Sequence, residues 1–275
     1  MLEVIKAVFK LRWKYTVRYP GWAIFFIFVP IVFSLIPIIL GWAVAGGPQQ
    51  ATINFKLRVG TENYTLFMIL GSAVWVLSIG VMWDFGMWLR EEQEMGTLEQ
   101  LLLTPANIYH ILLGSTIFTV ALSATQFISV ILFGGLMFGF LPELAKPSTL
   151  LAILYLVLGI VPLTGFALLI GCLIVSIREA EAIIRLLEPI IAFLVGVFYP
   201  ITIMPSFVKY LALLIPLTIS LQDMRAVILE LDYVFNPYLD MMILLTYCIV
   251  WPSIAMITYR YVERKAKKEG GLGGY

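Results

Sequence analysis

Long apolar segments, separated by short polar ones, most strongly restrict what this chain can fold into. An α-helix rises about 1.5 Å per residue, so a segment of about twenty residues crosses a hydrocarbon core of about 30 Å. Of the residues, 61% are hydrophobic and 13% are charged, against roughly 45–50% and 25% in a soluble domain. The sequence therefore predicts an all-α polytopic membrane protein. The five long apolar segments are residues 22–45, 65–88, 108–141, 149–175 and 237–259.

A sixth apolar segment, residues 183–199, is shorter and contains Pro189. Another apolar segment, 207–221, follows it and is broken by Pro216. Neither the spacing nor the length permits two ordinary spans here. We expect residues 201–235 to form two re-entrant half-helices that enter the outer leaflet and turn back, which membranes tolerate where protein or water covers the broken backbone. The alternative is a loop that lies on the outer surface.

Basic residues flank the apolar bundle at both ends of the chain. Within residues 1–19, Lys and Arg recur every four positions beside an apolar stripe, which predicts an amphipathic interfacial helix with its basic face toward lipid phosphates. The alternative is a plain positive flank to the first span. Residues 261–275 are basic and then Gly-rich, and we expect a cytoplasmic tail there. The recurring basic residues are Lys6, Lys10, Lys14 and Arg18.

The basic residues also predict the topology. Six spans over residues 22–260, with both termini in the cytoplasm, place thirteen of the 18 Lys and Arg residues inside and five outside. An excess of cytoplasmic Lys and Arg is what the positive-inside rule requires. Residues 1–275 are therefore expected to form a single transmembrane domain, multi-pass in the cell membrane.

The densest acidic cluster lies between the second and third spans, in the segment LREEQEMGTLEQLLLTP at 89–105. So many carboxylates cannot lie in hydrocarbon, so this segment must be in water. Thr97 and Gln100 have the spacing of a capping box, which predicts a helix that begins at Leu98. Pro105 disfavours helical geometry at the residue before it, so the helix has only about two turns.

The short helix is suited to docking on another protein. Gly96 in front of it frees the chain to turn sharply. Leu98, Leu101 and Leu102 lie on one face, at the i, i+3 and i+4 positions. A capped helix with an apolar stripe, held in a loop between two spans, fits a groove on a partner. The alternative is a helix that lies on its own membrane surface.

Several function classes lack their sequence signals. No G-x-x-x-x-G-K-[ST] motif occurs, so the chain has no P-loop and its energy must come from a partner or a gradient. One histidine, and two cysteines within apolar segments, give no metal or disulfide signal. A net charge of +1 gives no indication of nucleic acid. A secondary transporter usually needs ionisable groups near the midplane; whether Asp84 or Glu188 faces a pathway stays open.

Two motifs carry a family resemblance. The acidic loop resembles the first-inner-loop motif of the type-2 permeases of ATP-binding cassette transporters. A second set, in the expected order, resembles the region from the fifth span to the outer hairpin of that family. The first motif is Glu94, Gly96, Thr97, Leu98, Glu99, Gln100, Leu101, Leu102, Thr104 and Pro105, and the second is Gly196, Phe198, Tyr199, Pro200, Pro205, Pro216 and Arg225.

The resemblance implies an export permease that forms a homodimer, or pairs with a homologous permease, and binds a separate ATP-binding cassette ATPase. It implies no catalytic residue, metal or cofactor in this chain, because ATP and Mg belong to the partner. The segment 97–103 would be the main cytoplasmic coupling helix, with Arg178 and Glu179 near a second contact. The half-helices would close the outer end of the pathway.

The cargo expected from this resemblance is hydrophobic or amphipathic, such as a drug, a lipid or a lipid-linked glycan. Abundant Phe, Trp and Met suit such cargo, but contact with membrane lipid explains them equally well. The alternative function is a secondary transporter, or a channel-like protein, without an ATPase partner.

Overall fold

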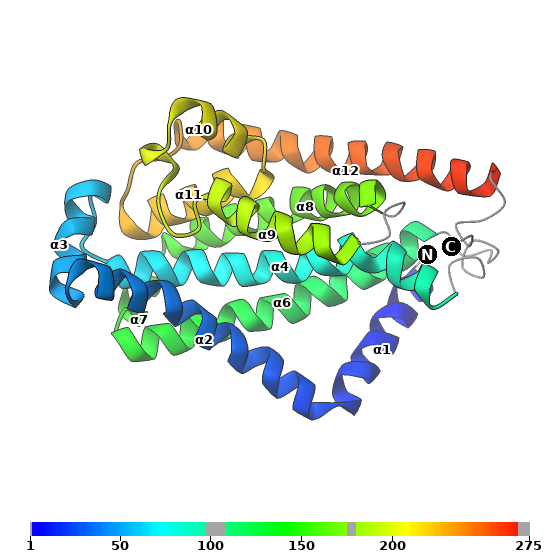
Figure 1. Cartoon of the computed structure of the whole chain (residues 1–275), viewed down its shortest axis with the longest axis horizontal. Coiled ribbons are helices and arrows are strands. Elements are labelled where there is room, and N and C mark those ends of the chain that lie inside the picture. Colours follow the sequence, from blue (N-terminus) through cyan, green and yellow to red (C-terminus); the bar gives the residue numbers. More distant parts are fainter. Residues whose placement is uncertain (1, 97–107, 175–179, 269–275) are drawn as a thin grey trace.

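The computed structural model describes residues 2–96, 108–174 and 180–268 (Figure 1). Every regular element in these ranges is a helix, which confirms the all-α prediction. The helices are α1 (Leu2–Arg18), α2 (Pro20–Ala45), α3 (Pro48–Val59), α4 (Tyr64–Glu94), α6 (Ile108–Phe138), α7 (Leu141–Leu144), α8 (Thr149–Ile174), α9 (Ala180–Val195), the 3₁₀ turn η1 (Ile201–Ile203), α10 (Ser206–Leu213), α11 (Pro216–Leu229) and α12 (Pro237–Lys268).

The five long apolar segments are confirmed as helices. Helices α2, α4, α6, α8 and α12 are each long and apolar enough to cross a membrane. Helix α9 has 16 residues, or about 24 Å, which is less than a hydrocarbon core of about 30 Å. Helices α10 and α11 reach the required length only as a pair bent by 103°. The described residues therefore contain five candidate spans, or six if the bent pair is one, and the arrangement predicted with six spans stays a prediction.

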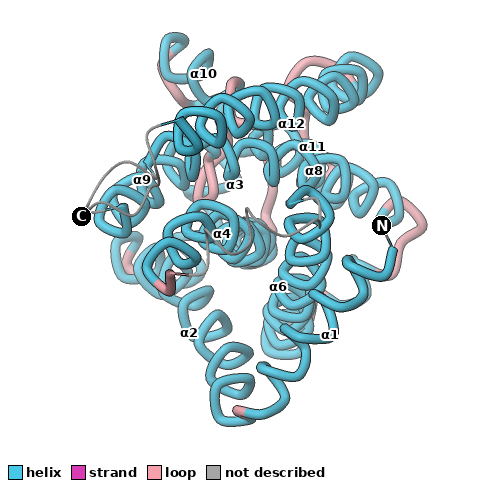
Figure 2. The backbone as a smooth tube through the Cα atoms, turned by 90° about the vertical axis from the view of Figure 1, so that its right-hand side faces the viewer, coloured by secondary structure: helices cyan, strands magenta, loops and turns pink. Residues whose placement is uncertain are grey.

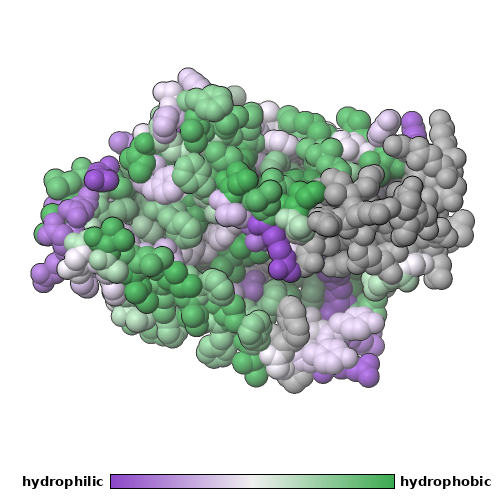
Figure 3. Space-filling model, in the orientation of Figure 1, coloured by the Kyte–Doolittle hydropathy of each residue, from purple (hydrophilic) through white to green (hydrophobic). Residues whose placement is uncertain are grey.

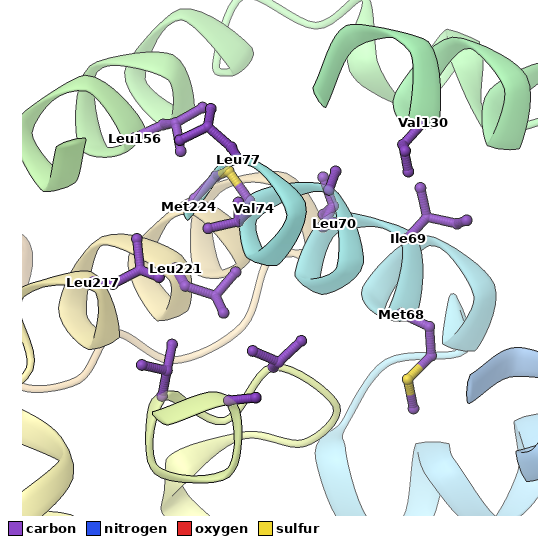
Figure 4. Packing of buried hydrophobic residues seen from close by; sticks show 14 of the residues in the cluster. Met68, Ile69, Leu70, Val74, Leu77, Val130, Leu156, Leu217, Leu221 and Met224 are labelled. Atoms are coloured by element: carbon purple, nitrogen blue, oxygen red, sulfur yellow. The ribbon is translucent and has the colours of Figure 1, made fainter. Parts of the chain in front are cut away.

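Helix α4 forms the centre of the bundle. Figure 2, a view along the bundle, shows α2, α6, α8 and α9 around it, and 72% of its apolar window is buried. In the membrane, such helices associate through close packing, because lipid tails are as apolar as leucine. Figure 4 shows side chains of α4 directed at α8, α11 and α6. They are Val74 and Leu77 near Leu156 and Met224, and Ile69 near Val130.

Small residues bring α8 and α12 together. A Cβ atom on Gly165 would lie 2.6 Å from the backbone nitrogen of Pro252, closer than real Cβ contacts allow. Glycine therefore permits this approach, as small residues commonly do between membrane helices. Nearby, the rings of Phe166 and Trp251 meet edge to face at 5.1 Å between centroids.

The surface is apolar in the middle and more polar towards its ends. Figure 3 shows a green, apolar band over α2 and the central bundle, with purple residues around α3 at one end and α1 at the other. Large apolar side chains on α2 and α12 are more than half exposed, including Phe25, Phe33, Ile249 and Ile257. An exposed belt of this kind fits contact with hydrocarbon, so the chain is a multi-pass membrane protein.

The start of α1 and the end of α12 lie at the same end of the bundle, at the right of Figure 1, and α3 lies at the left. Residues 2–18 are helical, as predicted, but α1 packs on α6, where the Phe9 and Phe118 rings meet at 5.6 Å. Its place at a membrane interface stays a prediction. Helix α12 continues to Lys268, so the predicted tail begins as helix.

Candidate functional site

The predicted half-helices are present as α10 and α11. Pro216 occupies the first turn of α11, where its missing N–H is not needed, and Pro205 precedes α10. Every residue of α11 except Val227 is buried. Protein therefore covers α11, whose burial does not fit a loop on the surface. In contrast, Phe207 and Tyr210 of α10, and Leu214 at the break, are exposed. Entry of the pair into the outer leaflet stays a prediction.

Arg225 fastens this hairpin to the rest of the bundle. Its side chain is 1% exposed. Nη1 donates to the carbonyl of Gly196 at 2.8 Å, and Nη2 donates to Phe67 at 3.1 Å and to Val197. The guanidinium carbon lies 3.6 Å from the centre of the Phe67 ring, a cation–π distance. One side chain thus joins α11, α4 and the turn after α9.

The turn after α9 is built from tight backbone contacts. Gly196 has φ +71°, which favours glycine. Gln222 of α11 donates to the carbonyl of Val195 at 3.0 Å. A Cβ atom on Gly71 of α4 would overlap Nη2 of Arg225 and the carbonyl oxygen of Val197. Glycine at two distant positions therefore makes the three-element contact possible.

The predicted pathway residues do not form one contact cluster. Gly196 and Arg225 are in direct contact, and Tyr199 donates to the carbonyl of Phe193 at 2.7 Å. Pro200 precedes η1, and Phe198 lines a cavity. The sequence analysis did not identify Phe67, Gly71 and Gln222 as parts of this contact, because nothing in their local sequence pattern indicates it.

Two buried carboxylates hold the loop before α12. Asp223 accepts from the backbone N–H of Val234 at 3.4 Å, and Asp240 accepts from that of Phe235 at 3.1 Å. Both Asp side chains are fully buried. Buried carboxylates require such donors, and these connect the hairpin to the last long helix. The sequence analysis did not single them out.

A cavity of about 1110 Å³ lies between α2 on one side and α4 and α6 on the other. Arg12 of α1 lies at one end of it. Asp84 lies beside Arg12, pairs with its Nη1 atom, and accepts from the hydroxyl of Ser115 at 3.1 Å. The apolar lining residues include Phe26, Val29, Phe33, Trp75, Val76, Ile79, Phe118 and Leu122.

The two acidic residues of uncertain role differ in position. Asp84 lines the cavity, whereas Glu188 is absent from the described lining residues. Glu188 accepts from the indole N–H of Trp83, and the Arg185 guanidinium lies 5.8 Å from the centre of that ring. Glu188 is thus placed to fix α9 against α4.

Most of the predicted coupling residues lie outside the described part of the chain. These are Thr97 to Pro105, together with Arg178 and Glu179. Glu94 ends α4. Gly96 has φ +68°, the left-handed conformation expected of a glycine that turns the chain. Among the described residues other than its chain neighbours, no atom lies within 4 Å of the place a Cβ atom on Gly96 would take.

Comparison with known proteins agrees with this arrangement. A family model described as "ABC-2 family transporter protein" matches residues 47–257, from α3 through most of α12. A protein of Cyanophora paradoxa named "Putative transport permease ycf38" is 27% identical over 196 residues, which cover 71% of this chain and 67% of that protein. The match to the family model includes α4, the hairpin and the residues that contact Arg225.

Proposed function

The chain belongs to the ABC-2 family of transporter proteins, and on that premise we propose that it is the permease subunit of an ATP-driven exporter. It is a transport permease with several membrane-crossing helices. The family match over residues 47–257 is the single observation that carries the proposal. The chain itself has no P-loop, so ATP and Mg are bound and ATP is hydrolysed by a separate ATP-binding cassette subunit.

The two ends of the bundle have different roles in this proposal. The segment 94–105, with Arg178 and Glu179, transmits ATPase movement at the end where α4 finishes. The hairpin closes the opposite end. Its contacts with α4 and α9 through Arg225 support this role, because they make the closure a rigid unit of the bundle.

The permease acts as a dimer, either with itself or with a homologous permease. Its cargo is hydrophobic or amphipathic. The apolar lining of the cavity supports such cargo, since few lining residues carry charge.

Copurification tests the proposal. A tagged permease isolated from its native membranes should bring with it an ATP-binding cassette ATPase, and the complex should hydrolyse ATP. In vesicles, transport should require ATP and continue when ion gradients are collapsed. Transport that needs no ATP but stops with the gradient would favour a secondary transporter instead, with Asp84 as its first candidate carrier of the coupling ion.

Labelling of single cysteines tests the topology. Leu57, Met95 and Ser148 are exposed, and each is replaced by cysteine in a chain with Cys172→Ser and Cys248→Ser. Because the positive-inside rule places both chain ends in the cytoplasm, an impermeant maleimide should react with positions 57 and 148 in intact cells. Position 95 should react only after permeabilisation. Reaction at position 95 in intact cells would overturn the topology.

A further inference from the structure

The cavity beside α4 is elongated. Its lining runs along α4 from Ser72 to Asp84, and along α2 from Phe26 to Leu40. At about 1.5 Å per residue, these stretches measure about 18 Å and 21 Å. One leaflet of a hydrocarbon core is about 15 Å thick, so the cavity is long enough to hold an extended acyl chain.

One end of the cavity carries charge. Both carboxylate oxygens of Asp84 are engaged, one by Arg12 Nη1 and the other by the Ser115 hydroxyl. A guanidinium carries five N–H donors, and within the described residues the pair with Asp84 engages Nη1 of Arg12. The Arg12 side chain is 26% exposed, against 16% for Asp84. The more exposed member of the pair is thus the cation, whose planar set of donors suits an anion such as a phosphate group.

The long walls present apolar surface. Two of the polar side chains among them have partners within the protein: the Gln126 amide donates to the Phe26 carbonyl at 2.9 Å, and the Ser34 hydroxyl donates to the Ile31 carbonyl at 2.7 Å. The buried Ser72 hydroxyl has no hydrogen-bond partner among the described residues, so the walls are mainly but not wholly apolar. The volume of about 1110 Å³ lies above the range of roughly 300–1,000 Å³ of pockets for small molecules. Length, volume and a single charged end together describe the shape of a lipid.

We propose that this cavity binds one phospholipid-like molecule. Its phosphate contacts the Arg12 guanidinium, and its acyl chain lies between α2 and α4. The molecule enters from the leaflet at the α1 end. This inference rests on the proposed function, because it names a lipid class for the cavity whose apolar lining supports amphipathic cargo. Binding of the lipid needs neither the ATPase nor transport, so its failure is distinguishable from failure of the proposed function.

Photolabelling of the full-length permease tests the site. The protein is placed in vesicles of an uncharged galactolipid that contain a trace of photoactivatable phosphatidylglycerol, or a photoactivatable galactolipid with the same acyl chains. The phosphate probe should label peptides of α2 and α4 at least fivefold more than the uncharged probe. Equal labelling by the two probes would overturn the proposal, as would an absence of label, the result expected if a second copy of the chain covers the cavity.

A space-filling variant tests the cavity itself. Ile79→Trp places a large side chain among the lining residues and should lower labelling by phosphatidylglycerol at least fivefold. The matched control is Ile128→Trp on α6, at a position 53% exposed and outside the lining, which should leave labelling unchanged. Equal labelling in both variants would place the lipid elsewhere.

Substitutions of Arg12 and Asp84 test whether the guanidinium recognises the phosphate of the lipid head group. Arg12→Gln and Asp84→Asn both break the same pair, so a purely structural role would make their effects alike. A phosphate contact predicts different effects. Arg12→Gln should abolish the preference for the phosphate probe, whereas Asp84→Asn should keep or increase it, because the guanidinium remains and loses its competitor. Equal losses in the two variants would contradict recognition by Arg12.

Discussion

Arg225→Met should destabilise the permease, because the substitution leaves a buried carbonyl group without its donor. The Val197 carbonyl, in the turn after α9, accepts from Nη2 of Arg225, whereas the Gly196 carbonyl keeps a long contact of 3.4 Å with the Gln222 amide after Nη1 is lost. An unsatisfied buried acceptor costs about 1–3 kcal/mol. That is a measurable part of a typical folding stability of about 5–15 kcal/mol. The measurement is thermal denaturation of the purified protein in detergent.

Two matched variants separate the buried contact from charge alone. Arg58→Met removes an exposed cation from α3 and should leave the melting temperature nearly unchanged. Arg225→Lys keeps the charge but replaces the planar fork with one ammonium group, which cannot reach carbonyls on opposite sides. It should restore only part of the stability. If Arg225→Met melts like the unchanged protein, the hairpin does not depend on this side chain.

A substitution of Gly71 provides an independent test of the contact between Arg225, α4 and the turn after α9. Gly71→Ala adds one methyl group that overlaps the Val197 carbonyl and Nη2 of Arg225, and the backbone carbonyl cannot simply rotate away. The variant should therefore lower the melting temperature although alanine favours helices. Gly21→Ala is the control, since no described atom beyond its chain neighbours and its own helix backbone lies within 4 Å of the added atom. Equal melting of the two variants would contradict the close approach of α4 and the turn.

The sequence predicted the long helices because bilayer thickness alone sets their length and apolar character. The prolines around 200–216 also predicted the broken hairpin correctly, since proline removes helical hydrogen bonds. In contrast, the charge count included Arg225 among the five cations outside, with Lys56, Arg58, Lys146 and Lys209. It gave no sign that Arg225 is buried against Phe67, 158 positions away. No local pattern encodes such a contact. The sequence did not predict the Arg12–Asp84 pair for the same reason, since the two residues are 72 positions apart.

The second large effect is expected for a substitution in the proposed coupling helix, and it concerns binding of the ATPase. If Leu101 enters a groove on the ATPase, its burial contributes roughly 1.5–3 kcal/mol, and an aspartate in its place is desolvated without a partner. Leu101→Asp should therefore reduce copurified ATPase at least tenfold, since 1.4 kcal/mol is already a factor of ten. The position lies in the predicted aqueous loop, so membrane insertion and dimerisation should be nearly unaffected.

Gly96→Val separates binding of the ATPase from transmission of its movement. At φ +68° a β-branched residue is strained, but beyond its chain neighbours no atom of the part of the chain that the structure describes lies within 4 Å of an added Cβ atom. The variant should redirect the segment without removing its apolar face, so ATP-dependent transport falls while part of the ATPase stays bound. Copurified ATPase, ATP hydrolysis and transport are measured together for both variants. Full binding and full transport in Leu101→Asp would contradict docking, and the segment would then be assigned to its own membrane surface.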